Sequence, residues 1–355
     1  MIPPRITAFY ALTHRVRWRI FAFLFAFAFI AYFQQKGLTV AAERIMPDLG
    51  ISQVQVGWLE WAFVLGYAAF QFPGGVIGQR LGARVTFTLI GTVAFLATVL
   101  TPLAPQLLRG AGLFVMLFAL QLLMGLAQAG IFPVGSGVME AWFRPEKWAI
   151  IQGVQTMGMQ FAAAATPPIV ALLMSSVGWQ KALLWPALPA VFVIALWAWY
   201  GRNTPNQHPS VSAAELAELD VRPGKQSSTT LSGRRIMQVL ADRSILLLTF
   251  SYVCMNYVFY LIGNWCFLYL VQERHFNILE SGWLAMIPPL AAGLGGGIGG
   301  KLVAVLCDRI GIRWGFRLLP MLALPTSGTL ILVAVNLNNP YGAVIALALA
   351  YAVLE

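Results

Sequence analysis

A lysine and two neighbouring amides interrupt an apolar part of the sequence. The segment FAFIAYFQQKGLTVAAE, residues 27–43, places Gln34, Gln35 and Lys36 in a row. A charge at the centre of a membrane helix costs about 2.5–3.5 kcal/mol on insertion scales, so such residues usually face a cavity or a partner. Lys36 could hold an anion by a charge-assisted hydrogen bond. It could also anchor the helix at the lipid headgroups, although Gln34 and Gln35 lie deeper and are poorly placed for that.

A second polar face follows in the next apolar run. Glu60, Tyr67 and Gln71 are seven and four residues apart, a spacing that places them on one face of a helix. Glu60 is the nearest plausible counter-ion for Lys36, and it could carry a proton. Tyr67 could line a cavity or pack between helices.

A third polar stripe comes later in the chain. Tyr252, Asn256, Tyr260 and Asn264 recur every four residues within an apolar run. Four polar residues on one face are unfavourable against lipid. They are therefore expected to line a cavity or to make hydrogen bonds between helices.

The composition identifies the environment of these residues. Of the 355 residues, 59% are hydrophobic and only 10% are charged, against about 25% in a soluble protein. Apolar runs of roughly 20 residues, the length that crosses a bilayer as a helix, recur along the chain. The sequence predicts an all-α polytopic protein in contact with the lipid bilayer. The predicted spans are 18–42, 54–78, 85–104, 111–139, 149–174, 182–200, 245–271, 282–306, 316–336 and 341 to the end.

The basic residues predict an orientation. Most of the 23 lysines and arginines lie in one alternate set of loops, which includes the N-terminus and residues 202–243. By the positive-inside rule both are cytoplasmic, so a cell (inner) membrane is expected. This distribution also explains the net charge of +10 without nucleic acid as a partner.

The predicted spans fall into two groups. Residues 1–201 form a six-helix half, 202–243 a polar cytoplasmic linker, and 244–355 an incomplete second half with about four spans. Within the linker, SAAELAELD could be a short surface helix capped by Ser212. The loop GVIGQRLGAR at 75–84 and the loop VLCDRIGIR at 305–313 share an Arg-x-Gly-x-Arg core. This repetition suggests a duplication typical of transporters.

Four segments carry a resemblance to a known family: FVLGYAAFQFPGG, GQRLGAR, GIFPVGSGVMEAWFRPEKWA and NWCFLYLVQERHFNILESGWL. With these segments the chain resembles the major facilitator superfamily, and within it the anion:cation symporter family of organic-acid permeases. The resemblance covers almost the whole chain. It implies two pseudo-symmetric six-helix halves, the second truncated within the tenth of twelve spans, so the chain could be a fragment.

The resemblance also implies roles for individual positions. Members commonly carry an acidic–basic pair where Gln34 and Gln35 align, and an arginine and an acidic residue where Gln121 and Gln128 align. Amides can hydrogen-bond a substrate but cannot titrate, so the usual proton-coupling carboxylates are missing here. Tyr67 matches a tyrosine at the substrate cavity. The two repeated loops latch the inward side in the superfamily, and their gating residues here are Gln79, Arg80, Arg84, Asp308 and Arg309.

These features together favour transport of a small organic anion, a sugar acid or other carboxylate, by alternating access. Lys36 would attract the carboxylate. Proton symport through Glu60, uniport and exchange are all compatible with the sequence. The alternative is a non-transporting membrane sensor or interaction protein on the same scaffold. Residues expected to hydrogen-bond the substrate are Gln35, Tyr67, Gln121, Gln128, Asn256, Tyr260 and Asn264.

No cofactor, metal site or enzymatic activity is expected. The three cysteines, Cys254, Cys266 and Cys307, lie in or beside apolar runs without metal-ligand spacing. The three histidines lie in terminal or loop regions. The glycine-rich GLGGGIGG at 293–300 lies inside an apolar run, so it indicates close helix packing rather than a nucleotide site.

Overall fold

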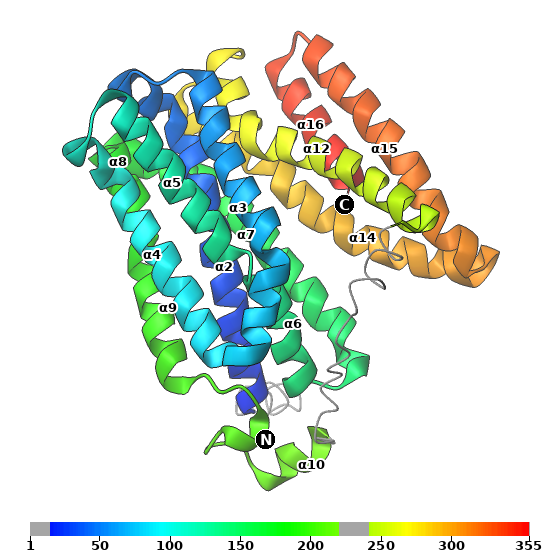
Figure 1. Ribbon diagram of the computed structural model, residues 1–355. Helices are drawn as coiled ribbons and strands as arrows, with labels where there is room; N and C mark the ends of the chain where they lie inside the picture. Colours follow the sequence, from blue (N-terminus) through cyan, green and yellow to red (C-terminus); the bar gives the residue numbers. More distant parts are fainter. Residues whose placement is uncertain (1–14, 220–240, 355) are drawn as a thin grey trace, which may run out of the picture. The chain divides into compact units, whose positions relative to one another are not determined.

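The computed structural model describes residues 15–219 and 241–354, and every regular element in these ranges is a helix (Figure 1). The prediction of an all-α polytopic membrane protein is confirmed. The helices are α2 (Val16–Leu49), α3 (Gln53–Leu81), α4 (Ala83–Leu107), α5 (Gly110–Gln128), α6 (Ile131–Trp142), α7 (Pro145–Val177), α8 (Trp179–Leu184), α9 (Ala187–Tyr200), η1 (Pro205–Gln207), α10 (Ala213–Leu219), α12 (Arg243–Gln272), α13 (Ile278–Ala285), α14 (Ile287–Ile310), α15 (Ile312–Asn336) and α16 (Pro340–Leu354).

Nine helical segments of the described residues are long and apolar enough to cross a bilayer, and α16 is a shorter apolar helix. Each predicted span coincides with one of these segments, but the helices run further. Helix α2 continues to Leu49, past Pro47, although a proline has no N–H to donate to the carbonyl four residues earlier. Gly50 then ends it in the left-handed conformation, at φ 65°.

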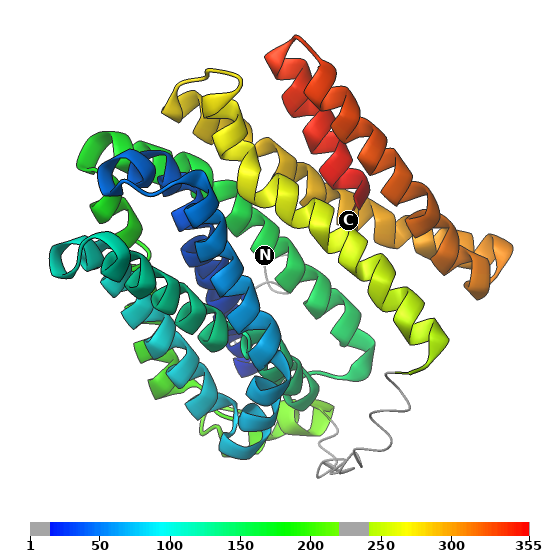
Figure 2. The same ribbon diagram turned by 45° about the horizontal axis from the view of Figure 1, so that its top comes forward.

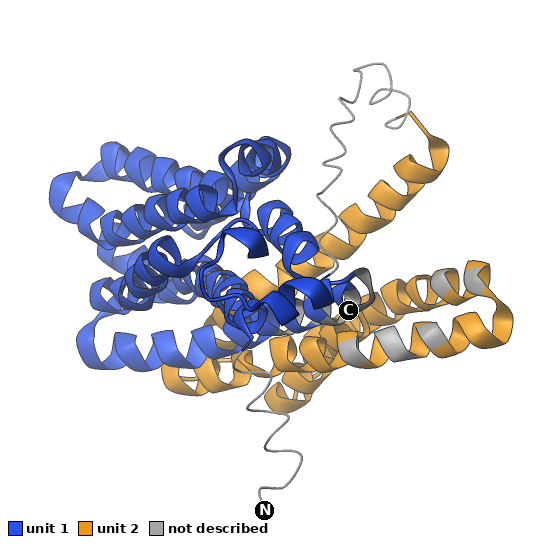
Figure 3. Cartoon of the chain, turned by 90° about the horizontal axis from the view of Figure 1, so that it is seen from below, with its two compact units in different colours: residues 1–220 blue, residues 221–355 orange. Residues whose placement is uncertain are grey.

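The chain divides into two compact units, residues 1–220 and 221–355 (Figure 3). Helices α2 to α10 belong to the first unit and α12 to α16 to the second. The first unit has a buried aromatic core in which Trp142, Trp197 and Phe87 are fully enclosed. In the second unit α14, α15 and α16 pack side by side (Figures 1 and 2).

Glycines allow the closest helix contacts in each unit. A Cβ on Gly66 of α3 would overlap the carbonyl oxygen of Leu122 on α5, and a Cβ on Gly125 of α5 would overlap that of Phe63 on α3. In the second unit, a Cβ on Gly295 of α14 would overlap the carbonyl oxygen of Ala352 on α16. The predicted close packing of the glycine-rich span is therefore confirmed at Gly295.

The repeated loops form the same backbone turn. Gly82 joins α3 to α4 with φ 79° and ψ 159°, and Gly311 joins α14 to α15 with φ 85° and ψ 156°. Each glycine N–H bonds the carbonyl four residues earlier, of Gly78 and Cys307 respectively. This region of backbone space is essentially restricted to glycine. The sequence repeat therefore corresponds to a repeated tight turn.

Candidate functional site

Lys36 lies on α2 with only 5% of its side chain exposed. The adjacent Gln35 is half-buried, and Gln34 and Thr39 on the same helix are buried. The structure therefore buries the lysine together with its polar neighbours on α2.

A carboxylate from the next helix lies near this lysine. Glu60 of α3 interacts electrostatically with Lys36. Its Oε1 also accepts a hydrogen bond from the Thr39 hydroxyl, at 2.5 Å. Two residues of α2 therefore hold one carboxylate of α3, and the three form a charged cluster inside the unit.

The amides that align with charged residues of the related family meet each other. Gln128 of α5 donates from Nε2 to Oε1 of Gln34 on α2, at 3.2 Å, and both side chains are buried. Gln34 Nε2 is also buried, and it has no hydrogen-bond partner among the residues that the structure describes. Gln121, on the same helix as Gln128, is also buried.

Gln34 borders two small cavities in the first unit, each of about 20 Å³. One is almost entirely apolar apart from Gln34 and Gln128. The lining of the other cavity includes the polar residues Thr98, Thr101 and Gln121 as well as Gln34. Each is large enough for one water molecule, but not for a sugar acid.

Tyr67 makes an aromatic contact and a polar contact with residues of its own helix, α3. Its ring stacks on Phe63 of the same helix, with centroids 6.1 Å apart. Its hydroxyl accepts a hydrogen bond from Gln71 at 3.4 Å, and Gln71 is exposed. One side of the tyrosine therefore packs, and the other takes part in polar contacts.

The polar stripe on α12 belongs to the second unit. Tyr252 is exposed, Asn256 and Tyr260 are half-buried, and Asn264 is buried. Asn256 donates to the carbonyl of Tyr252 one turn earlier, at 2.8 Å. The stripe thus runs from an exposed to a buried end along one helix.

The positions predicted to gate transport differ in their surroundings. Gln79, Arg80, Asp308 and Arg309 are exposed. Arg84 donates from its guanidinium to the carbonyl of Ala198 near the end of α9, where a positive charge is favourable. Asn203 Oδ1 accepts the N–H of Arg84 at 2.9 Å. Arg84 therefore joins the start of α4 to the end of α9.

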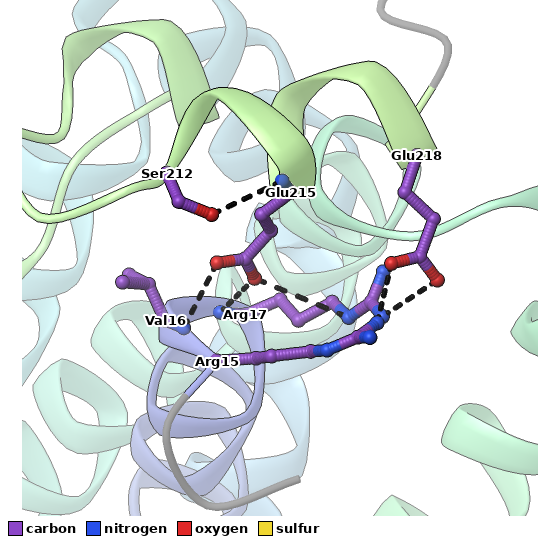
Figure 4. Close-up of polar contacts among 6 residues, drawn as sticks. All are labelled: Arg15, Val16, Arg17, Ser212, Glu215 and Glu218. Atoms are coloured by element: carbon purple, nitrogen blue, oxygen red, sulfur yellow. Dashed lines mark hydrogen bonds and ion pairs between the residues drawn. The ribbon is translucent and has the colours of Figure 1, made fainter. Parts of the chain in front are cut away.

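Sequence reasoning missed a charged cluster at the start of α2 (Figure 4). Helix α10 is N-capped by Ser212, as predicted, since its hydroxyl accepts the N–H of Glu215 at 3.2 Å. The Glu215 carboxylate accepts the N–H groups of Val16 and Arg17. Glu218 pairs with Arg15, and with Arg17 at 2.9 Å. An Arg-x-Arg pair and two acids three residues apart are the only local signal for this docking.

The residues before α10 also pack onto the first unit. His208 is buried and makes edge contacts with Tyr200 and Trp142. Burial, together with the charge of Arg202, lowers its pKa. The polar segment that follows α9 is therefore folded up to Leu219 instead of acting as a linker from residue 202. Among the described residues, no cluster of three or more His, Cys, Asp or Glu could hold a metal ion.

Comparison with known proteins gives the family. The sequence profile of the Major Facilitator Superfamily matches residues 24–354. The chain belongs to this superfamily. It is a multi-pass membrane protein. Solved superfamily structures share the fold: a bacterial homologue of the human lysosomal transporter Spinster (TM-score 0.69, 17% identity, 95% of this chain and 72% of the other) and a D-xylose-proton symporter (TM-score 0.66, 11% identity, 94% and 78%).

Sequence relatives within the superfamily have names that refer to organic acids. The chain is 28% identical to a probable galactarate/D-glucarate transporter of Bacillus subtilis, over 83% of this chain and 66% of the relative. It is 27% identical to a probable sulfoacetate transporter of Cupriavidus necator (81% and 64%) and 26% identical to the hexuronate transporter of Bacillus subtilis (93% and 75%). The chain spans about two thirds of the length of the first two.

Proposed function

We propose that this superfamily member carries out secondary active or facilitated transport of a small organic anion, a sugar acid or other carboxylate, by alternating access. The observation that carries the proposal is the enclosed Lys36, 5% exposed on a helix long enough to span the bilayer. A buried ammonium is kept where it has an anion to hold. The names of the relatives, which specify galactarate, glucarate, hexuronate and sulfoacetate, support an anionic substrate.

In this proposal Lys36 attracts the carboxylate, and polar side chains bind hydroxyl groups of the substrate. Gln35, Tyr67, Gln121 and Gln128 are the proposed contributors from the first unit. Asn256, Tyr260 and Asn264 are those from the second. Glu60 is the proposed counter-ion of Lys36, and protons are the proposed coupling ion.

The proposed membrane is the cell (inner) membrane, with the N-terminus in the cytoplasm. The support is the concentration of arginines in alternate loops. A reporter fused near Ser227 should be accessible only from the cytoplasmic side. Labelling of that site from outside would contradict the orientation.

The test of function is solute uptake by the purified chain in sealed vesicles. We expect a gradient of D-glucarate, D-glucuronate or sulfoacetate to drive accumulation of the unmodified solute. Recovery of a chemically changed solute would indicate an enzyme instead. Specific binding in detergent without any uptake would favour a sensor or interaction protein.

A further inference from the structure

The cluster on α2 and α3 brings a basic and an acidic side chain into electrostatic interaction. Lys36 interacts electrostatically with Glu60, and Thr39 donates a 2.5 Å hydrogen bond to the same carboxylate. Lys36 is almost fully buried and Glu60 is half-buried. The chain itself therefore supplies a carboxylate that interacts electrostatically with the ammonium proposed to hold the substrate.

Few other charges of the described residues are placed to compensate Glu60. Helix α5, which packs closely on α3, has no titratable side chain. Asp48 of α2 accepts a hydrogen bond from Trp179, at 2.7 Å. Tyr32 of α2 and Tyr67 of α3 are the titratable residues on these two helices closest in sequence to Lys36 and Glu60. Other charged groups near this end of α2 and α3 are Glu43, Arg44, Arg109 and Lys181, and those of the packed helices toward the start of α2 include Arg84, Glu140, Lys147 and Tyr200.

We propose that Glu60 is the proton-coupling group, and that a bound anion brings about its protonation by taking Lys36 away from it. The inference rests on the proposed transport function. It assigns coupling to a carboxylate on α3, whereas the positions that resemble the family's acidic residues, Gln34 and Gln128, are a hydrogen-bonded amide pair that cannot titrate.

The exchange can be followed charge by charge. The substrate carboxylate pairs with the Lys36 ammonium, so Glu60 loses its compensating charge. A carboxylate without an opposite charge in a low-dielectric site favours its neutral form. One proton from water therefore binds a carboxylate oxygen of Glu60, and no covalent bond of substrate or protein breaks. One negative charge and one proton have entered, so the net charge of the site is unchanged.

Thr39 sets the resting state of this exchange. Its hydroxyl donates to the Glu60 carboxylate, and a hydrogen bond to the charged form favours that form. Before the anion arrives, both Thr39 and Lys36 favour the ionised form of Glu60. After the anion has arrived, the hydroxyl alone is insufficient to keep the charge.

The experiment is titration calorimetry of the purified chain with D-glucuronate, D-glucarate and sulfoacetate in buffers of different ionisation heat. For the wild type we expect uptake of about one proton per anion bound. Glu60→Gln should abolish proton uptake while binding is retained or tightened, because the competing carboxylate is gone. Glu43→Gln, the same change two turns beyond Lys36 on α2, is the matched control and should leave proton uptake as in the wild type.

The outcomes separate this inference from the function on which it rests. Anion binding without proton uptake by the wild type, or uptake that survives in Glu60→Gln, would overturn the coupling role and leave the proposed transport intact. Failure of the folded wild type to bind any of the three anions would overturn both.

A second variant covers the case in which Glu60→Gln does not fold. In Thr39→Val the ionised form of Glu60 loses its hydrogen bond from residue 39. Without bound anion, Glu60 should therefore stay protonated up to a higher pH than in the wild type. The acid edge of the pH range that shows proton uptake should therefore move to higher pH. Curves of uptake against pH that superimpose for Thr39→Val and the wild type would contradict the proposal.

Discussion

The carboxylate of Glu215 caps the helix to which Arg17 belongs. Its Oε1 accepts the N–H of Arg17 at 3.2 Å, and Oε2 accepts the N–H of Val16 at 3.3 Å. Negative charge at a helix N-terminus is stabilising, and the first N–H groups of a helix have no partner within it. Arg17 is 2% exposed and Glu215 6%, so the interaction is shielded from water.

Glu215→Ala should therefore lower the thermal stability of the first unit more than Glu218→Ala. The Glu215 variant loses the cap, which is worth about 0.5–2 kcal/mol, and removes a charge facing the buried Arg17. Glu218 is 37% exposed, so its ion pairs should contribute about 1 kcal/mol or less. Unfolding midpoints in detergent measure both. An equal effect of the two variants would contradict the capping role.

The pairing of Glu218 predicts a pH dependence of stability. The hydrogen bond from Arg17 lowers the pKa of Glu218 below its ordinary value of 4.5. The folded state thus binds this proton more weakly than the unfolded state. The stabilisation by ionised Glu218 is complete when the pH is above the ordinary pKa, and it is lost as the pH falls through the lowered pKa of the folded state. The difference in midpoint between wild type and Glu218→Gln should shrink on acidification, and a difference that grows would have the wrong sign.

The two repeated turns offer a matched pair of variants. Gly82→Ala and Gly311→Ala both force a Cβ into a glycine-only backbone region, at a cost of about 1–3 kcal/mol. A Cβ at Gly311 meets nothing within 4 Å, whereas one at Gly82 overlaps the Asn203 side chain that bonds Arg84. Gly82→Ala should therefore be the more destabilising.

The control for these variants is Gly137→Ala. Gly137 lies within α6, where a Cβ meets nothing within 4 Å. Alanine there should be neutral, or stabilising by about 0.5–1 kcal/mol. If Gly311→Ala behaved like this control, backbone conformation would not be the reason for glycine in the repeated loop.

Lys36→Gln should weaken binding of an anionic substrate by roughly 10- to 150-fold. A charge-assisted hydrogen bond is worth about 1.5–3 kcal/mol, and 1.4 kcal/mol is a tenfold change. The corresponding neutral amide should bind almost equally to both proteins, and Lys36→Arg should keep part of the affinity. Dissociation constants for an acid and its amide decide the matter. Equal changes for both ligands would mean that Lys36 is not the anion site.

The spans were predictable because each depends on a local run of apolar residues. The Ser212 cap was predictable for the same reason, since an N-cap and the N–H it accepts are three residues apart. The partners of Gln34 and Glu215 were not. Gln34 meets Gln128 across 94 residues and Glu215 meets Val16 across 199. Such pairings depend on how helices are rotated and docked, and local periodicity does not contain that information.

The cap on α2 can form only late in the synthesis of the first unit. Val16 leaves the ribosome 199 residues before Glu215. At about 5–20 residues per second, synthesis of that interval takes roughly 10–40 s. During this time the N–H groups of Val16 and Arg17 lack the Glu215 carboxylate as their hydrogen-bond acceptor, while five more spans are synthesised and inserted. Within the first unit, the capping of α2 is therefore completed last. It can occur only after all six spans of that unit have been synthesised.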